Sequence, residues 1–393
     1  MIKNLIILAA VLCSLMFFRL IYLGESGIKG LQVLGVMIIV GVIFVQLIYD
    51  KTFRIKQSFS WEVALLLVAV LLSMITPYRD YGQSIKTSLI AQRHMYFILF
   101  YFMLHAIKPS QMQVQRIFII IGILYSLFSI MQYLAYPTMI FDVRASLDRG
   151  TIRIFLPGNI FAVVTYFLCL HYFFRSYSFK YVIIMGIILS FFVLQGTRQT
   201  LASVGFASFL FVLFNRKIKS KLLIMVLVGL SLIPLYFAFE SIFSEMLNVT
   251  ESQSERFEDN VRVRAATFFL TYFKHDIWGY LLGSGMDSQK NVYGLLIESY
   301  KENLGFYIED IGIIGEFVRY GALFVLAQIL IIVKVFRSKL PNSLMYIKIY
   351  FIVFVMTLFT GAGYFTFSFT AIGLMLYQID LAKTEKLLSI NHE

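Results

Sequence analysis

Apolar runs of about 20 residues recur along the whole chain, separated by short segments that hold most of the charged residues. A helix of that length crosses a hydrocarbon core of about 30 Å, and it satisfies its own backbone hydrogen bonds there. Only 14% of the residues are charged, whereas a soluble domain has roughly 25%. The pattern therefore predicts an all-α polytopic integral membrane protein rather than a soluble enzyme.

We predict about twelve spans in a single transmembrane domain that covers residues 1–393. The predicted spans are 4–23, 31–49, 61–77, 94–107, 116–136, 158–174, 180–195, 199–214, 222–239, 311–336, 345–361 and 364–380. The first run lacks a small-residue cleavage site and another span follows directly, so we expect a retained helix rather than a signal peptide. Cys13 and Cys169 lie in apolar runs, which predicts neither a disulfide nor a metal site.

Lysine and arginine gather in alternate loops, and this bias sets the expected orientation. The loops after the even-numbered spans hold Lys51, Arg54, Lys56, Lys108, Arg116, Arg175, Lys180, Arg216, Lys217, Lys219, Lys221, Lys334, Arg337, Lys339, Lys383 and Lys386. Because short cytoplasmic loops are enriched in these residues, we expect both termini in the cytoplasm. The net charge of +12 serves orientation, and we expect no nucleic-acid partner.

Basic residues also occur in the loops on the other side, which should be depleted of them. They are Arg79, Lys86 and Arg93 after span 3, Arg144, Arg149 and Arg153 after span 5, and Arg198 after span 7. Scatter, with pairing to Asp80, Asp142 and Asp148, would explain single residues. An anionic ligand at the outer face would explain all of them, because guanidinium groups offer paired donors to phosphate oxygens.

One large extracytoplasmic (periplasmic) loop, 240–310, is predicted between spans 9 and 10 and carries twelve acidic and six basic residues. Loops of this length are usually functional. Ala266, Phe269 and Phe273 form an apolar stripe, which predicts an amphipathic helix on the membrane or on the bundle. Just inside span 10, Glu316 and Arg319 are one turn apart and are expected to pair.

Three segments carry recognisable motifs, in order along about residues 140–325. They are Arg153 followed by Pro157-Gly158-Asn159; Gly196-Thr197-Arg198; and a late region with Arg262, Arg264, Trp278, Gly283-Ser284-Gly285, Asp310-Ile311-Gly312, Gly315 and Tyr320-Gly321. Together they resemble the O-antigen polymerase/O-antigen ligase superfamily of bacterial cell envelopes. Its members have an arginine before a Pro-x-Asn helix start, a Gly-Ser/Thr-Arg turn and a large outer loop.

The resemblance implies a multi-pass glycosyltransferase of the bacterial plasma (inner) membrane. Its donor would be a glycan on undecaprenyl diphosphate, and its acceptor the sugar of the next lipid-linked repeat unit, joined at the outer face. The family works without a metal, so we expect no metal and no cofactor. Membrane lipids and a chain-length regulator are the other expected partners.

The chemistry that the resemblance implies needs charge stabilisation of the departing diphosphate and a base for the acceptor hydroxyl. Arg198, at the start of span 8, is the first candidate for the diphosphate; non-specific contact with lipid phosphate is the alternative. The other candidates for binding diphosphate or glycan are Arg153, Arg149, Arg144, Arg93, Arg79 and Arg264. Pairing with Asp148 for Arg153, and with Glu258 or Asp259 for Arg264, is the competing interpretation. Asp310 is the candidate base and Glu309 its alternate, although either could merely cap a helix.

Two other functions compete with a polymerase. A ligase of the superfamily, which moves the glycan to a lipid A core or another envelope acceptor, usually has a histidine late in the loop. Residues 298–303 contain none, and His275 is too early. A flippase or transporter of lipid-linked sugars predicts charges along a path within the spans, but the span interiors are nearly bare except for Arg19, Glu316 and Arg319.

Overall fold

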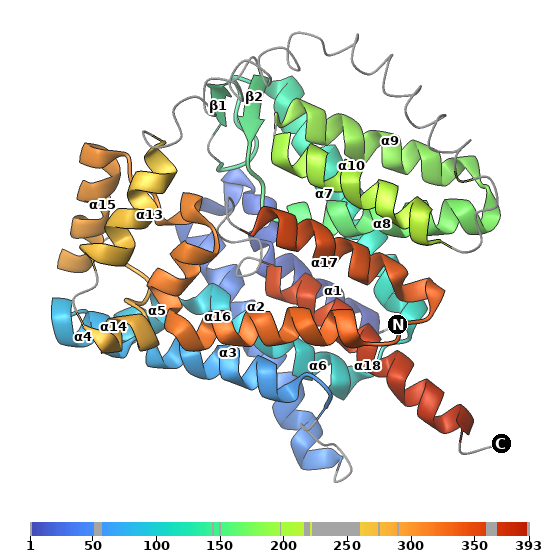
Figure 1. The fold of residues 1–393 in the computed structure, drawn as a ribbon, viewed down its shortest axis with the longest axis horizontal. Coiled ribbons are helices and arrows are strands. Elements are labelled where there is room, and N and C mark those ends of the chain that lie inside the picture. Colours follow the sequence, from blue (N-terminus) through green and yellow to red (C-terminus); the bar gives the residue numbers. More distant parts are fainter. Residues whose placement is uncertain are drawn as a thin grey trace.

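The computed structural model describes residues 2–50, 57–143, 145–148, 151–196, 198–215, 221, 260–273, 276–288, 291–358 and 368–390. Within these ranges the chain is almost entirely helical, which confirms the predicted helical class (Figure 1). The strands in the described chain form one antiparallel hairpin, of β1 (Ala145–Asp148) and β2 (Thr151–Ile154). In it Ser146 lies opposite Arg153.

Every predicted span except 222–239, which lies outside the described residues, contains a helix. Up to the hairpin the helices are α1 (Ile2–Ser14), α2 (Gly24–Tyr49), α3 (Ser60–Leu72), α4 (Ile75–Tyr81), α5 (Ile85–Ala91), α6 (Phe100–Ile107) and α7 (Gln111–Ala135). After it come α8 (Asn159–Ser176), α9 (Phe179–Leu194), α10 (Arg198–Phe214), α13 (Val261–Thr271), α14 (Ile277–Leu282), α15 (Val292–Leu304), α16 (Ile313–Arg337), α17 (Met345–Thr357) and α18 (Phe369–Ile390). Short 3-10 helices include η3 (Arg93–Leu99), η4 (Ile308–Ile311) and η5 (Asn342–Leu344).

The turn between α6 and α7 shows how local chemistry ends one helix and starts the next. Lys108 closes α6 in the left-handed conformation, with φ 55°, and Pro109 follows without an N–H to continue the helix. Ser110 then opens α7 with a capping box: its hydroxyl accepts from the backbone N–H of Gln113, while the Gln113 side chain accepts from the backbone N–H of Ser110. Two otherwise unpaired donors of the first turn are satisfied in this way.

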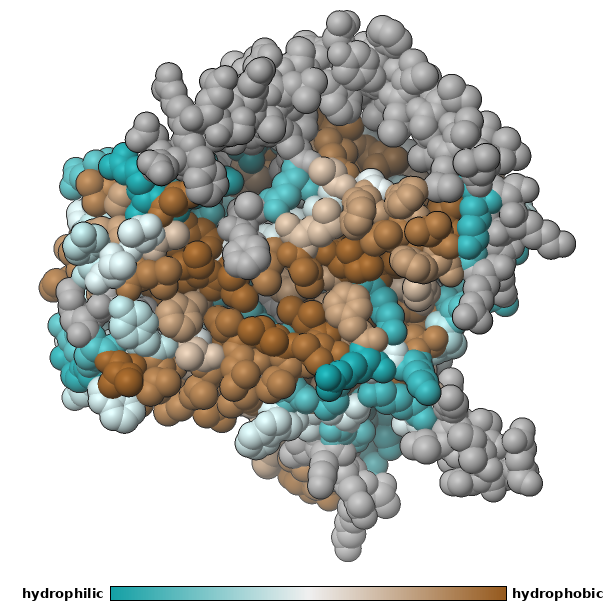
Figure 2. Space-filling view, viewed as in Figure 1, coloured by the Kyte–Doolittle hydropathy of each residue, from teal (hydrophilic) through white to brown (hydrophobic). Residues whose placement is uncertain are grey.

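Among the described residues, four segments are long and apolar enough to cross a membrane: Ile21–Tyr49, Ser60–Tyr81, Gln111–Ala135 and Ile313–Arg337. Figure 2 shows an apolar band across the middle of the molecule, with hydrophilic residues gathered toward both ends. On α2 alone, Met37 and Phe44 are 65% and 62% exposed. A large contiguous apolar surface of this kind marks a contact with lipid or another apolar partner, so the helices indicate membrane association.

The loops after even-numbered spans meet at one end of the bundle, which we call the inner end. There Lys334 forms an ion pair with Glu62 at 2.7 Å, and the Lys383 Nζ donates to the Ser58 hydroxyl at 2.9 Å. The first turn of α1 and the last turns of α18 lie toward this end (Figure 1). The grouping of loops agrees with the predicted one, although the membrane side of each end stays a prediction.

The loops after spans 3 and 9 meet at the opposite, outer end, where α4, α5, α13, α14 and α15 gather (Figure 1). The Gln83 side chain donates to the Met286 carbonyl at 2.9 Å. Helices α13 and α15 share a small apolar core of their own, in which Phe269, Phe273 and Tyr293 are buried. The predicted amphipathic helix therefore turns its apolar stripe toward protein, not toward lipid.

The chain's two tryptophans offer a test of membrane placement. Trp61 begins α3 at the inner end and Trp278 lies in α14 at the outer end, and they are 71% and 56% exposed. Tryptophan prefers the membrane–water interface, so each single-tryptophan variant in liposomes should be quenched most by lipids brominated near the headgroup. A Val40→Trp substitution in the tryptophan-free background, at mid-α2, should instead be quenched most near the chain ends. Equal depths for all three would contradict this placement.

Candidate functional site

Helix α16 breaks at Gly321, where φ is 77° and ψ is −177°. Only glycine adopts that backbone region without strain. Figure 1 shows that the first turns of α16 lie at a steep angle to the rest, across the outer end. The predicted single span 311–336 is thus a short outer segment followed by a longer helix.

The turn Gly283-Ser284-Gly285 is held directly against this break. The Ser284 N–H donates to the Val318 carbonyl and the Gly285 N–H to the Arg319 carbonyl, both at 2.8 Å. A Cβ on Gly283 would lie 2.3 Å from the Arg319 carbonyl oxygen, and one on Gly321 would lie 2.2 Å from that of Leu281. The turn Gly283-Ser284-Gly285 and the break at Tyr320-Gly321 therefore pack backbone against backbone. We call this contact the glycine junction.

Arg319 occupies the junction with its side chain only 7% exposed. It pairs with Glu309 from η4 and with Asp287, whose carboxylate is 3.8 Å away. This differs from the predicted pair, because Glu316 accepts a hydrogen bond from the Gln328 side chain instead. The outer end thus holds a buried guanidinium between two carboxylates, fixed by the glycine junction.

The two candidate bases differ in this environment. Burial alone would raise the pKa of Glu309, but the charges of Arg319 and Lys301 outweigh it and lower the pKa to about 2. A carboxylate that acidic, already bonded to a guanidinium, is a weak acceptor of a substrate proton. Asp310, the next residue, is exposed, so it is the more accessible of the two candidate carboxylates.

The first two motifs meet where the hairpin joins the helices. The Gln195 side chain, just before the Gly-Thr-Arg turn, donates to the Ile154 carbonyl of β2 at 3.1 Å. Gln199, just after it, donates to the Met356 carbonyl at the end of α17, at 3.0 Å. The N–H of Ile313, at the start of α16, donates to the Leu358 carbonyl at 2.8 Å. The end of α17 therefore contacts the second and third motif regions, and Gln195 connects the second to the first.

The predicted arginines have different surroundings. Arg79 pairs with Asp80 at 2.5 Å and with Asp276 at 2.7 Å, so its charge is balanced. Arg93 donates to the Ile90 carbonyl. Arg153 lies over the Phe155 ring at 4.9 Å and Arg264 over the Phe306 ring at 5.9 Å. The described part of the chain does not include Arg144, Arg149 or the side chain of Arg198. It also does not include the side chains of the alternative partners Asp148, Glu258 and Asp259.

Sequence reasoning missed Asp287 and the carboxylate–Arg319 pairing. The signal available was the acidic residue two positions after Gly285, in a loop that returns to α16. In the described ranges no group of three or more His, Cys, Asp and Glu side chains could hold a metal ion.

No protein-family model matches the chain, and no curated protein or solved structure matches it. The functional assignment therefore depends on the residues themselves. These are the outer-end cations, the three motif regions and the hydrogen bonds that bring those regions together.

Proposed function

We propose that this chain is a membrane glycosyltransferase that polymerises a glycan carried on undecaprenyl diphosphate. The observation that supports it most is the convergence of three motif regions at one end of an apolar bundle. Hydrogen bonds from Gln195, Gln199 and Ile313 tie the hairpin, the Gly-Thr-Arg turn and the start of α16 to their neighbours. That end would face the periplasm, with about twelve spans and both termini in the cytoplasm.

The reaction forms one bond and breaks one. The hydroxyl oxygen of the acceptor sugar attacks the anomeric carbon of the donor glycan, and the bond from that carbon to the diphosphate oxygen breaks. The hydroxyl proton passes to Asp310, and the lipid diphosphate leaves as an anion. Arg198 would bind the diphosphate at the N-terminal end of α10, where the helix dipole also favours an anion.

The hairpin extends the cationic surface. Arg144 and Arg149 flank β1 in the sequence, and Arg153 lies in β2, so a single element would present three guanidinium groups beside the diphosphate. Arg79 is the least available of the predicted ligands, because two carboxylates already neutralise it. Arg319 we regard as a support of the junction that positions Glu309 and Asp310.

Reconstitution with a lipid-linked repeat unit tests the function. The purified protein in liposomes, with no metal and no other acceptor, should produce a ladder of longer lipid-linked glycans. Transfer that appears only after a lipid A core or another envelope acceptor is added would assign the ligase reaction. If neither assay shows glycan transfer, a transporter would be favoured.

In the same assay Arg198→Ala should lower the rate about 100-fold, the usual cost of removing a donor that stabilises developing anionic charge. Arg198→Lys should also lose most activity, because an ammonium group does not offer paired donors. Lys86→Ala removes another outer-side cation and should leave the rate unchanged. Full activity of a normally inserted Arg198→Ala protein would remove Arg198 from the diphosphate site.

A further inference from the structure

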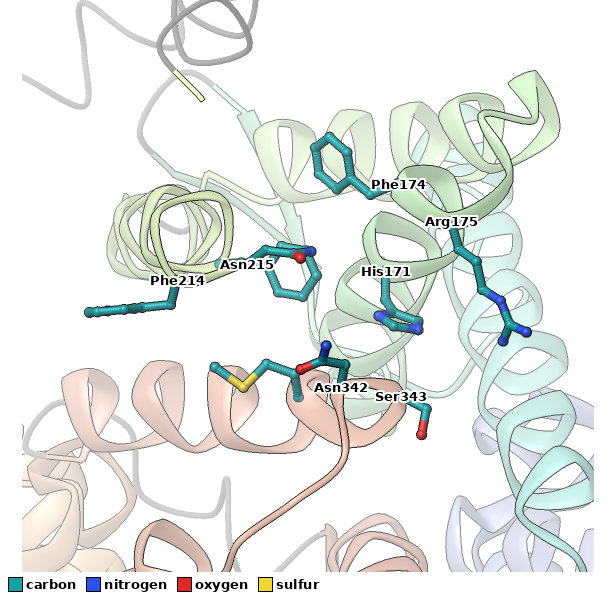
Figure 3. A pocket seen from close by; sticks show the side chains of 9 residues that line it. His171, Phe174, Arg175, Phe214, Asn215, Asn342 and Ser343 are labelled. Carbon is teal, nitrogen blue, oxygen red and sulfur yellow. The ribbon is translucent and has the colours of Figure 1, made fainter. Parts of the chain in front are cut away.

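A cavity of about 140 Å³ lies between α8, α10 and the η5–α17 segment at the inner end, opposite the candidate functional site (Figure 3). Its lining residues are His171, Phe174, Arg175, Phe211, Phe214, Asn215, Asn342, Ser343 and Met345. The volume is well above the roughly 10–15 Å³ that one water needs. It is below the roughly 300–1,000 Å³ of a site that encloses a drug-sized molecule. The space suits one small polar group.

The chemistry of the lining is that of an anion site. None of the nine lining residues is acidic. Figure 3 shows His171, Asn215 and Asn342 around the same space, with Ser343 at its edge and the Arg175 guanidinium beyond His171, on the side away from Asn215. These side chains supply N–H and O–H donors and one permanent positive charge. Exposed Phe214, at 60%, continues the site into the apolar surface of the bundle.

The position of the cavity narrows the choice of anion. Four basic residues, Arg216, Lys217, Lys219 and Lys221, follow Asn215 in the sequence. Clusters of this kind beside an apolar helix attract the anionic headgroups of a cytoplasmic leaflet. A molecule with a phosphate at the polar edge of the cavity and an acyl chain against Phe214 would contact both the polar lining and the apolar surface beside it.

We propose that this cavity binds a phosphate ester, with Arg175 as its charge partner and His171, Asn215 and Asn342 as hydrogen-bond donors. A phospholipid headgroup or a soluble phosphate ester could supply that chemistry. Helices α8, α10 and α17 line the cavity at one end and reach the motif regions at the other. An occupied cavity would therefore stabilise the packing of the helices that present Arg198 and the end of α17. This inference does not depend on glycosyl transfer.

Native mass spectrometry of the full-length protein in detergent tests the site. Phosphatidylglycerol should bind the wild-type protein, and diacylglycerol, which lacks the phosphate, should not. Arg175→Gln should weaken phosphatidylglycerol binding about tenfold, the effect of losing a charge-assisted hydrogen bond. Asn342→Trp, at an exposed position, should fill the cavity and weaken binding at least as much. Arg337→Gln, at the same end but outside the cavity, is the matched control.

Competition separates the two sources of phosphate. If millimolar glycerol 3-phosphate does not displace phosphatidylglycerol, the site takes a lipid headgroup; if it does, the site takes soluble phosphate esters as well. The melting temperature of each variant shows whether that variant is folded. If Arg175→Gln is not folded, the binding measured for Asn342→Trp tests the site. Equal binding to wild type, Arg175→Gln, Asn342→Trp and Arg337→Gln, or equally tight binding of diacylglycerol, would overturn the phosphate site.

Discussion

Gly321→Ala is expected to destabilise the protein by about 2–6 kcal/mol, the sum of two costs. A non-glycine residue at φ 77°, ψ −177° carries strain of about 1–3 kcal/mol. The new Cβ would also lie 2.2 Å from the Leu281 carbonyl oxygen, and forcing extra atoms into a packed interior costs about 1–3 kcal/mol. Gly283→Ala, with φ 80° and 2.3 Å to the Arg319 carbonyl oxygen, should behave alike.

Thermal unfolding in detergent, followed by size exclusion, measures the effect. The matched control is Gly186→Ala, because Gly186 lies in α9 and a Cβ there meets nothing within 4 Å. That variant should match the wild type or gain up to about 1 kcal/mol from better helix propensity. A Gly321→Ala protein that melts with the wild type would mean that the Gly283–Gly321 junction is not tightly packed.

Most helices of this fold could be predicted from the sequence, but two interruptions could not: the break in α16, and the end of α1 at Ser14 within the predicted span 4–23. Length and hydropathy decide where an apolar helix lies, and the predicted 116–136 and 180–195 differ from α7 and α9 only at their ends. A lone glycine inside an apolar run costs a helix only about 1 kcal/mol and is no evidence of a break. The conformation of Gly321 depends on Gly283, and that contact is tertiary.

In the candidate site, too, contacts between neighbours in the sequence could be predicted, and contacts between distant segments could not. The alternative interpretation of Arg79, pairing with Asp80, follows from adjacency, and the structure shows that pair. Asp142, which the same alternative named as a partner for an outer-loop cation, pairs instead with Arg19 at 2.8 Å. Spacing suggested a Glu316–Arg319 pair, but Arg319 is directed to Glu309 and Asp287 at the junction. Local spacing predicts contacts within one helix, and the partners of Arg319 come from outside it.

Arg319→Met is expected to cost about 3 kcal/mol at pH 7, the lower end of the penalty for breaking a buried ion pair. The substitution leaves two carboxylates without their cation, of which Asp287 is 13% exposed and Glu309 37% exposed. Water screens part of the charge of Glu309, so the upper end of the range does not apply. The loss should appear as a lower melting temperature in detergent.

The double variant Arg319→Met/Glu309→Gln tests whether the stranded charge is the cause. Removing the Glu309 charge as well should recover part of the loss, because replacing both partners of a buried pair costs less than breaking it. A double variant whose loss equals the sum of the two single losses would show that the pair is uncoupled.

Acidification should lower the melting temperature of the wild-type protein and raise that of Arg319→Met. Arg319 and Lys301 hold the pKa of Glu309 at about 2, below its ordinary value of 4.5. A lowered pKa in the folded state stabilises the protein above the ordinary pKa, and that stabilisation is lost as the pH falls from about 4.5 through about 2. In Arg319→Met, protonation of Glu309 instead removes an unpaired charge. The melting temperatures of wild type and Arg319→Met should therefore converge as the pH falls from 7 to 4 and below, whereas parallel curves would show that Glu309 does not titrate against Arg319.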